Sequence, residues 1–296
     1  MAAARFALLI TPAESTNEER ADFSDSFRRV DPSAPALSVG ELSTQRGDGI
    51  FESIGVIDGH VQEIGPHLQR LAHSAQLCDL PAPHLEQWRQ AAAVAAAECG
   101  PGEWVIKLIL SRGVEHGPAP TAWTTAAPAA DFSAARTRGI RVVTLDRGVD
   151  SEAPARAPWL LLGAKTLSYA VNMAAIREAV RRGADDAVFA SSDGILLEAP
   201  TASVVLRLGD RFVSPEPGAG ILQGTTQVSL FDHLRRLGHA ATYERLPVAA
   251  LAEADAAWLL SSVRLAAPIS AVDGTPKAID AELTASINRY LLSPRD

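Results

Sequence analysis

One lysine closes an apolar run in the stretch Pro158-Trp-Leu-Leu-Leu-Gly-Ala-Lys165-Thr-Leu-Ser-Tyr169. Lysine is rare in this chain, since Lys107 and Lys277 are the only others. An ammonium group is costly in apolar surroundings unless it is paired or neutralised. Desolvation would lower the pKa of Lys165 and free its lone pair, which predicts a nucleophilic amine for Schiff-base chemistry. A strand-end lysine whose head extends into water explains this stretch equally well.

The composition predicts a globular protein of the reducing cytoplasm. The chain has 296 residues, of which 47% are hydrophobic and 21% charged, enough for two modest domains. A net charge of −8 argues against nucleic-acid binding, which needs a basic surface. Cys78 and Cys99 form no disulfide framework, and no spacing predicts a metal site. The apolar start is too short for a signal peptide or a membrane-spanning helix, so no membrane partner is expected.

The first half of the chain mixes strands and helices in the manner of an α+β domain. Strands are expected at 5–10, 50–57, 61–64 and 104–111, and helices at 66–79 and 84–98. Asp58-Gly59 between apolar segments favours a two-residue hairpin turn. Residues 11–36 read as irregular. Residues 117–138 are rich in Pro, Ala and Thr and predict a linker or a loose surface excursion.

The second half is richer in strands. They are expected at 140–145, 186–190, 195–199, 203–208 and 211–214, with helices at 170–182 and 226–237. The predicted division is a small α+β domain at 1–130, a linker at 131–138 and a larger domain at 139–296.

Three weak signals for anion or cofactor binding accompany Lys165. Glu198, within an apolar strand-like run, needs a cationic partner, either an arginine or the protonated ring nitrogen of a cofactor. The run Gly218–Gln227 contains repeated glycines and precedes a helix, so Thr225 and Thr226 predict a phosphate site or an ordinary N-cap. Arg70 and Arg112 offer planar forks for phosphate or carboxylate, although solvent exposure is the simpler explanation for each.

Taken together, these motifs resemble the fold-type IV pyridoxal-phosphate enzymes, which comprise branched-chain aminotransferases, D-amino-acid aminotransferases and aminodeoxychorismate lyases. The resemblance covers residues 40 to 276. It is carried, in order, by Arg46-Gly-Asp-Gly-Ile-Phe-Glu52, His67-Leu-Gln-Arg-Leu71, Ser111-Arg-Gly113, Lys165, Glu198 and Gly224-Thr-Thr226. It implies a two-domain α+β chain, with a small α/β sandwich domain and a larger barrel-like domain that hold pyridoxal 5'-phosphate between them. It also implies a homodimer.

The resemblance assigns a role to each matching position. Lys165 matches the Schiff-base lysine and Glu198 the partner of the pyridine nitrogen. The positions that match phosphate ligands are Arg70, Thr225, Thr226 and Ser262. Arg112 looks like the arginine that holds the substrate carboxylate. Two positions depart from the family pattern, since Ser203 stands where asparagine is expected and Gln227 where arginine is frequent.

Within the family the chain looks most like an aminodeoxychorismate lyase. Thr44 matches a lyase threonine implicated in proton transfer, and Phe51 stands where D-amino-acid aminotransferases carry tyrosine. Ser261, by contrast, stands where a lyase asparagine is expected. The resemblance therefore implies elimination of pyruvate to give 4-aminobenzoate, with Lys165 as general base. An aminotransferase acting on D-amino or branched-chain amino acids is the alternative, and a non-catalytic relative is disfavoured because the lysine and glutamate are both present.

Overall fold

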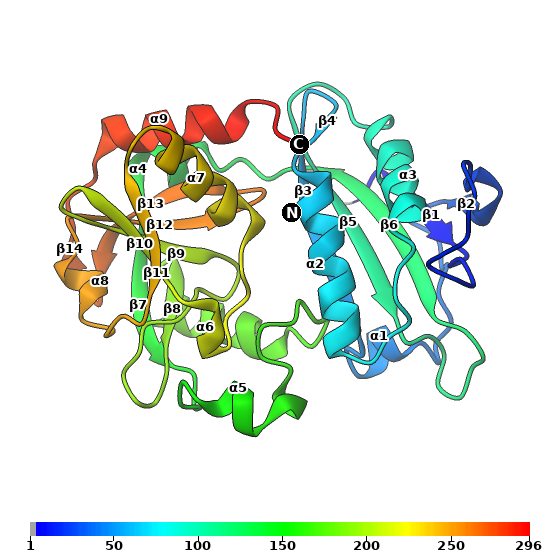
Figure 1. Cartoon of the computed structure of the whole chain (residues 1–296), viewed down its shortest axis with the longest axis horizontal. Helices are drawn as coiled ribbons and strands as arrows, with labels where there is room; N and C mark the ends of the chain where they lie inside the picture. The colour runs from blue at the N-terminus through cyan, green and yellow to red at the C-terminus, as the bar shows by residue number, and fades with distance from the viewer. Residues whose placement is uncertain (1–3) are drawn as a thin grey trace. The chain divides into compact units, whose positions relative to one another are not determined.

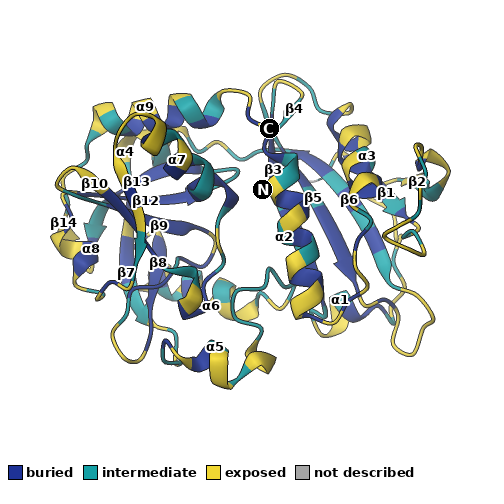
Figure 2. Ribbon diagram, in the orientation of Figure 1, coloured by how far each residue is buried: buried dark blue, intermediate teal, exposed yellow. Residues whose placement is uncertain are grey.

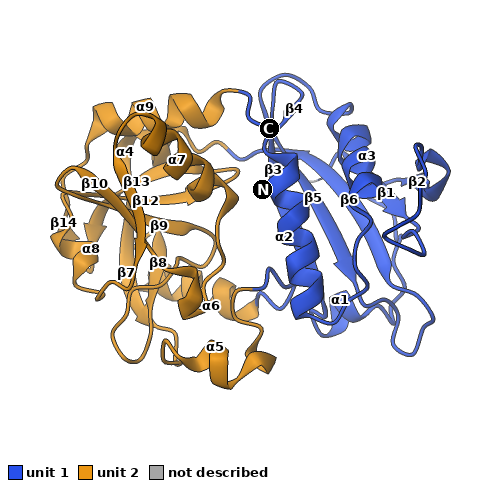
Figure 3. Cartoon of the chain, viewed as in Figure 1, with its two compact units in different colours: residues 1–130, 164–169, 294–296 blue, residues 131–163, 170–293 orange. Residues whose placement is uncertain are grey.

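The computed structural model describes residues 4–296 of the chain (Figure 1). Close contacts divide the chain into two compact units (Figure 3). Unit 1 comprises residues 1–130, 164–169 and 294–296, and unit 2 comprises residues 131–163 and 170–293. Each unit has its own sheet, so the chain is an α+β protein, as the sequence predicts. No described helix has the length and apolarity needed to span a membrane.

Unit 1 is built on a six-stranded antiparallel sheet in the order β2-β1-β6-β5-β3-β4. Its strands are β1 Phe6–Ile10, β2 Phe27–Val30, β3 Gly49–Ile57, β4 His60–Val61, β5 Glu103–Ser111 and β6 Thr121–Pro128. Its helices are η1 Ser24–Ser26, α1 Leu42–Gln45, α2 Ile64–Leu77 and α3 Leu85–Ala96. The predicted hairpin is confirmed, because Asp58 and Gly59 form the β3–β4 turn with φ of 48° and 84°. Positive φ suits glycine and, among other residues, aspartate.

Helices α2 and α3 pack on one face of this sheet (Figure 1). Leu68, Leu71 and Ala75 on α2 are fully buried, as are alternate residues of β3 such as Ile50 and Ile54. Figure 2 shows buried and exposed residues along α2. The spacing of these residues gives each element one apolar side, which explains why they form a layer.

Unit 2 is built on an eight-stranded mixed sheet in the order β11-β10-β9-β12-β13-β7-β8, with β14 paired to β13. Its strands are β7 Ile140–Asp146, β8 Asp186–Ala190, β9 Ser203–Leu208, β10 Arg211–Pro215, β11 Ala240–Glu244, β12 Ala256–Ser261, β13 Leu265–Val272 and β14 Thr275–Pro276. Its helices are α4 Ser133–Arg138, α5 Ala153–Arg156, η2 Pro158–Leu160, α6 Ala170–Arg181, η3 Pro217–Ala219, α7 Thr225–Arg236, α8 Ala250–Glu253 and α9 Ala281–Leu292.

Apolar residues of the central strands of unit 2 are buried on both faces of the sheet. Val204 and Leu206 of β9 belong to one buried cluster, while Val205 belongs to another that includes Leu230 and Phe231 of α7. A strand buried on both sides reads as a continuous apolar run, which is why β9 was recognisable from sequence.

Two expectations for residues 117–138 are wrong. Residues 121–128 form β6, a central strand between β1 and β5. Its small residues, including Ala122 and Ala126, are buried and contact the alanine-rich helix α3. The predicted linker at 131–138 contains α4, which packs on β13 and α9. Small side chains let helix and strand approach closely, and a pattern search for bulky apolar residues misses that packing.

Two shorter predictions also need correction. The irregular segment 11–36 contains β2, which pairs with β1. Residues 195–199, predicted as a strand, make only isolated bridges, to Ala190, Pro247 and Ala202. Hydrogen bonds still connect this segment to the end of β8, because the Leu197 amide donates to the Phe189 carbonyl and the Phe189 amide donates to the Glu198 carbonyl.

Candidate active site

Lys165 lies in a short segment that pairs with strand β3 within unit 1. The amide of Phe51 donates to the Lys165 carbonyl (3.0 Å), and the amide of Leu167 donates to the Gly49 carbonyl (2.7 Å). The Lys165 amide donates to the Ser74 hydroxyl of α2 (3.1 Å). A side chain on Gly49 would meet the Leu110 carbonyl at 2.8 Å, so the close approach of backbones here requires glycine. The lysine is thus held by backbone pairing on one side and by α2 on the other.

The Lys165 side chain lies over an aromatic ring. Its Nζ is 4.6 Å from the centroid of Phe51, and Phe51 packs edge-on against Tyr169 at 5.5 Å. The negative face of a phenyl ring attracts an ammonium group. The sequence singled out both residues, and the structure brings them together.

Arg70 is held by a buried carboxylate. Its Nε and Nη2 donate to the two oxygens of Glu52, at 2.8 and 2.7 Å, and His67 Nδ1 lies 2.7 Å from the same carboxylate. Glu52 and His67 have no exposed surface, and the Arg70 side chain is 11% exposed. Although burial raises the pKa of the Glu52 carboxyl, the Arg70 guanidinium and His67 hold it well below its ordinary value. Burial lowers the pKa of His67, so a neutral ring donates Nδ1–H to the carboxylate.

The contacts of Arg112 are internal to unit 1. Its Nε donates to Asp48 Oδ2 (2.7 Å), Nη1 to the Asp79 carbonyl (3.0 Å) and Nη2 to the Cys78 carbonyl (2.7 Å). The hydrogen bond that Arg112 donates to Asp48 raises the pKa of Arg112, which keeps the guanidinium charged. The guanidinium therefore ties the loop before β3 to the end of α2, and a substrate carboxylate would have to replace these partners.

Thr44 is exposed on α1, and its hydroxyl donates to the Glu41 carbonyl (2.8 Å). Glu41 itself is buried and accepts hydrogen bonds from the hydroxyls of Ser111 and Thr121. A loop carboxylate thus connects the segment bearing Thr44 with the end of β5.

Three hydroxyls converge at the N-terminus of α7 in unit 2. Ser262 Oγ lies 3.4 Å from Thr225 Oγ1 and 3.1 Å from Thr226 Oγ1. Gly224 is the N-cap and gives α7 no side-chain cap. The first amides of a helix have no intrahelical acceptor and carry partial positive charge. Hydroxyl donors beside such amides form a cradle for a phosphate group.

The two departures from the family pattern lie beside this cradle. A side chain on Gly224 would meet Ser203 Oγ at 2.3 Å, so serine and glycine at these positions depend on each other. Gln227, buried in the first turn of α7, accepts a hydrogen bond from the Tyr243 hydroxyl through Oε1 (3.0 Å). Ser203 therefore constrains the helix start by close packing against Gly224, and Gln227 by a neutral hydrogen bond.

The Glu198 carboxylate contacts a guanidinium and a main-chain amide in unit 2, and a further contact holds the segment that follows it. Arg147 Nη1 lies 3.4 Å from its Oε1, and the Leu222 amide donates to Oε2 (3.2 Å). Asn172 on α6 donates to the carbonyl of Pro200, two residues further along the chain (2.6 Å). The side chain of Glu198 is 14% exposed, so a cationic partner can still reach this carboxylate.

Several of these contacting residues were not predicted from sequence. Glu52 ends the motif Arg46–Glu52, but the sequence assigned it no role. Nothing in the sequence around Arg147 or Asn172 indicated a functional residue. Their partners are distant in sequence, and only the folded chain reveals them. A buried charged residue in a strand pattern, such as Glu52, is the one signal that could have prompted a search for a cation.

Comparison with known proteins gives a consistent family. Residues 49–272 match the family model for amino-transferase class IV. A bifunctional aminodeoxychorismate lyase / D-amino acid transaminase of Mycobacterium tuberculosis is 42% identical over 271 residues, covering 87% of this chain and 94% of that protein.

Solved structures agree with this match. A fold IV-transaminase of Curtobacterium pusillum has a TM-score of 0.92 and 46% identity, covering 97% of each chain. An aminotransferase of Mycobacterium tuberculosis, in a form with α-ketoglutarate and PMP bound, has a TM-score of 0.86 and 41% identity over 90% of this chain and 97% of its own. The chain belongs to the class IV aminotransferases, the fold-type IV enzymes that depend on pyridoxal 5'-phosphate.

Proposed function

We propose that this enzyme is an aminodeoxychorismate lyase, which eliminates pyruvate from 4-amino-4-deoxychorismate to give 4-aminobenzoate. The observation that carries the proposal is the phenyl ring of Phe51 beneath the Lys165 amine, where D-amino-acid aminotransferases carry tyrosine. A relative 42% identical to the chain is named as a lyase and transaminase, which supports the same reaction.

The residues present fit the cofactor. The hydroxyls of Thr225, Thr226 and Ser262, which converge at the start of α7, would bind its phosphate. Glu198 would accept a hydrogen bond from its protonated ring nitrogen and so keep that nitrogen positively charged. When bound, pyridoxal 5'-phosphate supplies an electron sink that stabilises negative charge on the substrate carbon.

Lys165 has two tasks in this proposal. Its Nζ would hold the cofactor before substrate arrives and, once released, would take the proton from C4 of the substrate as general base. The backbone pairing with β3 and the Phe51 ring keep the amine in one orientation. That orientation matters because proton transfer requires hydrogen-bond distance and alignment.

Thr44 would assist protonation of the leaving group. Its hydroxyl is exposed and already oriented by the Glu41 carbonyl, which accepts its proton in a 2.8 Å hydrogen bond. A hydroxyl can rotate to donate to another acceptor, so this contact leaves Thr44 available. Arg112 was expected to hold a substrate carboxylate, but its three internal contacts favour a supporting role at this end of β3.

The decisive experiment is incubation of the purified holoenzyme with aminodeoxychorismate, followed by quantification of 4-aminobenzoate and pyruvate. The proposal predicts equal amounts of both products, and their absence with active cofactor present would contradict it. Lys165→Ala should release neither product. A Lys277→Ala control should retain the wild-type rate, because Lys277 lies on unit 2 and donates to main-chain carbonyls.

Transamination is the second candidate. The relative named a bifunctional lyase and D-amino acid transaminase supports it, as does the relative solved with α-ketoglutarate and PMP. The test supplies D-alanine with 2-oxoglutarate and measures pyruvate and glutamate. Product formation without 4-aminobenzoate release from aminodeoxychorismate would favour the transaminase over the lyase.

A further inference from the structure

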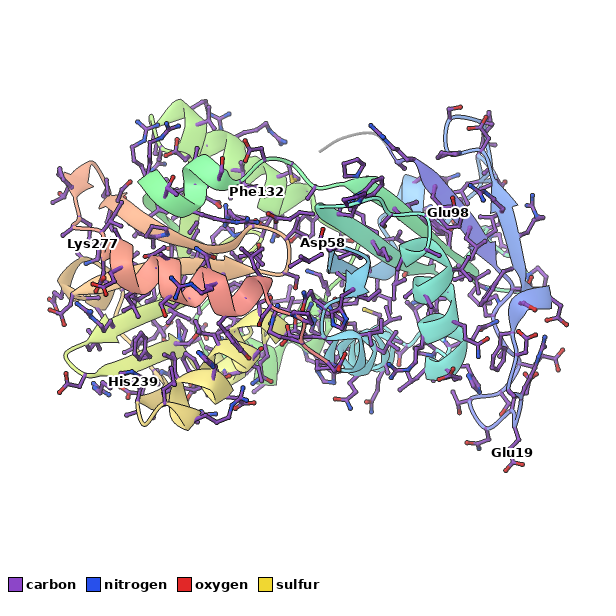
Figure 4. All side chains as sticks on the ribbon, turned by 90° about the horizontal axis from the view of Figure 1, so that it is seen from above. Glu19, Asp58, Glu98, Phe132, His239 and Lys277 are labelled. Atoms are coloured by element: carbon purple, nitrogen blue, oxygen red, sulfur yellow. The ribbon has the colours of Figure 1, made fainter. Side chains whose placement is uncertain are left out.

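The lysines of the chain differ in how their charges are satisfied. Lys277 donates to the main-chain carbonyls of Ala252 and Ala254 (Figure 4 labels Lys277). Lys165 lies over the Phe51 ring. Lys107 stands in the middle of β5, and none of the described residues, 4–296, pairs with its ammonium group. A half-buried cation without a partner in the middle of a sheet is costly, so it calls for a ligand.

Lys107 has a polar neighbour on each adjacent strand. The register pairs Ser53 of β3 with Lys107, and Lys107 with Thr125 of β6. Directly opposed residues of an antiparallel pair have Cβ atoms about 4.5–5.5 Å apart on the same face. Two hydroxyls therefore flank one ammonium in a single row across three strands, which we call the Ser53–Lys107–Thr125 row.

This row lies on the sheet face opposite to α2 and α3. Side chains alternate along a strand, and Glu52, beside Ser53, points to α2 through its contacts with His67 and Arg70. The row residues are each half-buried, so solvent reaches them. Burial lowers the pKa of Lys107, because the charged ammonium form is disfavoured where water is partly excluded.

The row lies close to the Lys165 amine. Phe51 and Ser53 are two residues apart on β3 and therefore share a face, and Phe51 carries Lys165 Nζ over its ring at 4.6 Å. Diagonal neighbours such as Phe51 and Lys107 have Cβ atoms roughly 7–8 Å apart at most. A substrate attached at the Lys165 side can thus extend along the sheet to Lys107. Arg112 is not free for this task, because its guanidinium binds Asp48 and two carbonyls.

We infer that the Ser53–Lys107–Thr125 row binds a carboxylate of the substrate that is remote from the reacting nitrogen. The ammonium supplies charge and up to three donors, and the two hydroxyls complete the shell of a carboxylate. The ligand class is therefore a substrate with two carboxylates, including a 2-oxo acid that carries a second carboxylate. This inference rests on the proposed function only in assigning Lys165 to the reacting nitrogen.

The test compares ligands that differ only in the remote carboxylate. Dissociation constants of the holoenzyme, in its amino form of the cofactor, are measured by absorbance titration for 2-oxoglutarate and for 2-oxopentanoate. In Lys107→Met, binding of 2-oxoglutarate should weaken about tenfold or more, the range for a lost charge-assisted hydrogen bond, while 2-oxopentanoate stays within about twofold. Lys107→Arg should recover most of the difference, and Lys277→Met should change neither constant.

Equal changes for the two ligands, or no change for 2-oxoglutarate, would overturn the inference. Stability gives a second readout, since the folded-state pKa of Lys107 is lowered below 10.5. The charged form is then disfavoured by folding, and this cost is fully present at neutral pH, below the folded pKa. Lys107→Met should therefore keep or raise the Tm at pH 7, and a lower Tm would make Lys107 a structural residue. Failure to form 4-aminobenzoate would reject the lyase while leaving this ligand comparison intact.

Discussion

The two units position their candidate groups by different means. Unit 1 uses a buried charge network, in which Glu52 holds Arg70 with support from His67. Unit 2 uses neutral hydroxyls at a helix start, where Ser262 meets Thr225 and Thr226. A charged network at low dielectric is strong when complete and costly when one member is missing, whereas single hydroxyls each contribute little. Removing one side chain of the charged network should therefore lower the stability of unit 1 far more than removing one hydroxyl lowers that of unit 2.

The largest expected effect concerns Lys165, the proposed Schiff-base lysine and general base. Lys165→Ala should remove the yellow absorbance that a cofactor aldehyde bound to the lysine gives, and borohydride should then trap no cofactor on the chain. Activity should fall by roughly a thousandfold or more, as for other nucleophile deletions. The measurement is an absorbance spectrum with mass analysis of the borohydride-treated protein, beside Lys277→Ala. Cofactor trapped on the variant at the wild-type level would sink the assignment.

The scarcity of lysine is what made Lys165 visible in the sequence. The β3–β4 hairpin was equally easy to predict, because Asp58-Gly59 between apolar segments strongly favours a tight turn. Strand β6 could not be predicted from local sequence. Its alanines, Ala122 and Ala126, are buried because the alanine-rich helix α3 packs on this strand, and α3 is distant in sequence. The segment around Glu198 was read as a strand because apolar runs favour one, but its bridges go to three different partners.

The same reason limited prediction of the site. The residues assigned from the resemblance lie where local motifs could indicate them. The partners that hold them, among them Glu52 and Arg147, are set by tertiary packing alone. Arg112 illustrates the limit most directly, because its contacts to Asp48 and two carbonyls could not be predicted from its position at a strand end.

The second effect tests the buried network of unit 1. Glu52→Gln keeps the shape of the side chain but leaves the Arg70 charge without its carboxylate, which should destabilise the protein by about 3 kcal/mol. Chemical denaturation at pH 7 measures this difference. Glu98→Gln, which removes an exposed partner of Arg29 (Glu98 is labelled in Figure 4), should cost under about 1 kcal/mol. Equal losses in the two variants would mean that burial adds nothing to the Glu52 pair.

The pH dependence of this network has a definite sign. The pKa of Glu52 is lowered on folding from its ordinary value of 4.5, so the folded state favours the ionised carboxylate. Its stabilising contribution is complete above pH 4.5 and is lost as the pH falls through the folded pKa. The gap in stability between wild type and Glu52→Gln should therefore narrow as the pH drops below 4.5. A gap that widens in acid would contradict the ionised assignment.

A smaller effect is expected for the hydroxyls of unit 2. Thr226→Val preserves the shape of a buried side chain and removes one donor from the phosphate cradle, which should weaken pyridoxal 5'-phosphate by about tenfold. Pyridoxal, which lacks the phosphate, should bind the variant and the wild type alike. Fluorescence titration of the apoenzyme with each compound measures both constants, and Thr242→Val on the exposed part of β11 is the matched control. An equal loss for pyridoxal would show that Thr226 acts on the helix and not on the phosphate.

The smallest effect concerns Arg112, and it separates the two cations of unit 1 that could meet a substrate carboxylate. The guanidinium is 40% exposed, so Arg112→Gln should cost about 1 kcal/mol or less of stability through its lost ties to Asp48 and α2. The ratio of dissociation constants for 2-oxoglutarate and 2-oxopentanoate should stay at the wild-type value, because a supporting residue touches neither carboxylate. If Arg112→Gln selectively weakened the binding of 2-oxoglutarate and Lys107→Met did not, Arg112 would be the residue that binds the substrate carboxylate. The two cations differ in their protein partners. A substrate carboxylate would have to displace Asp48 and two carbonyls from Arg112, whereas Lys107 has no such acceptors to lose among the residues that the structure describes.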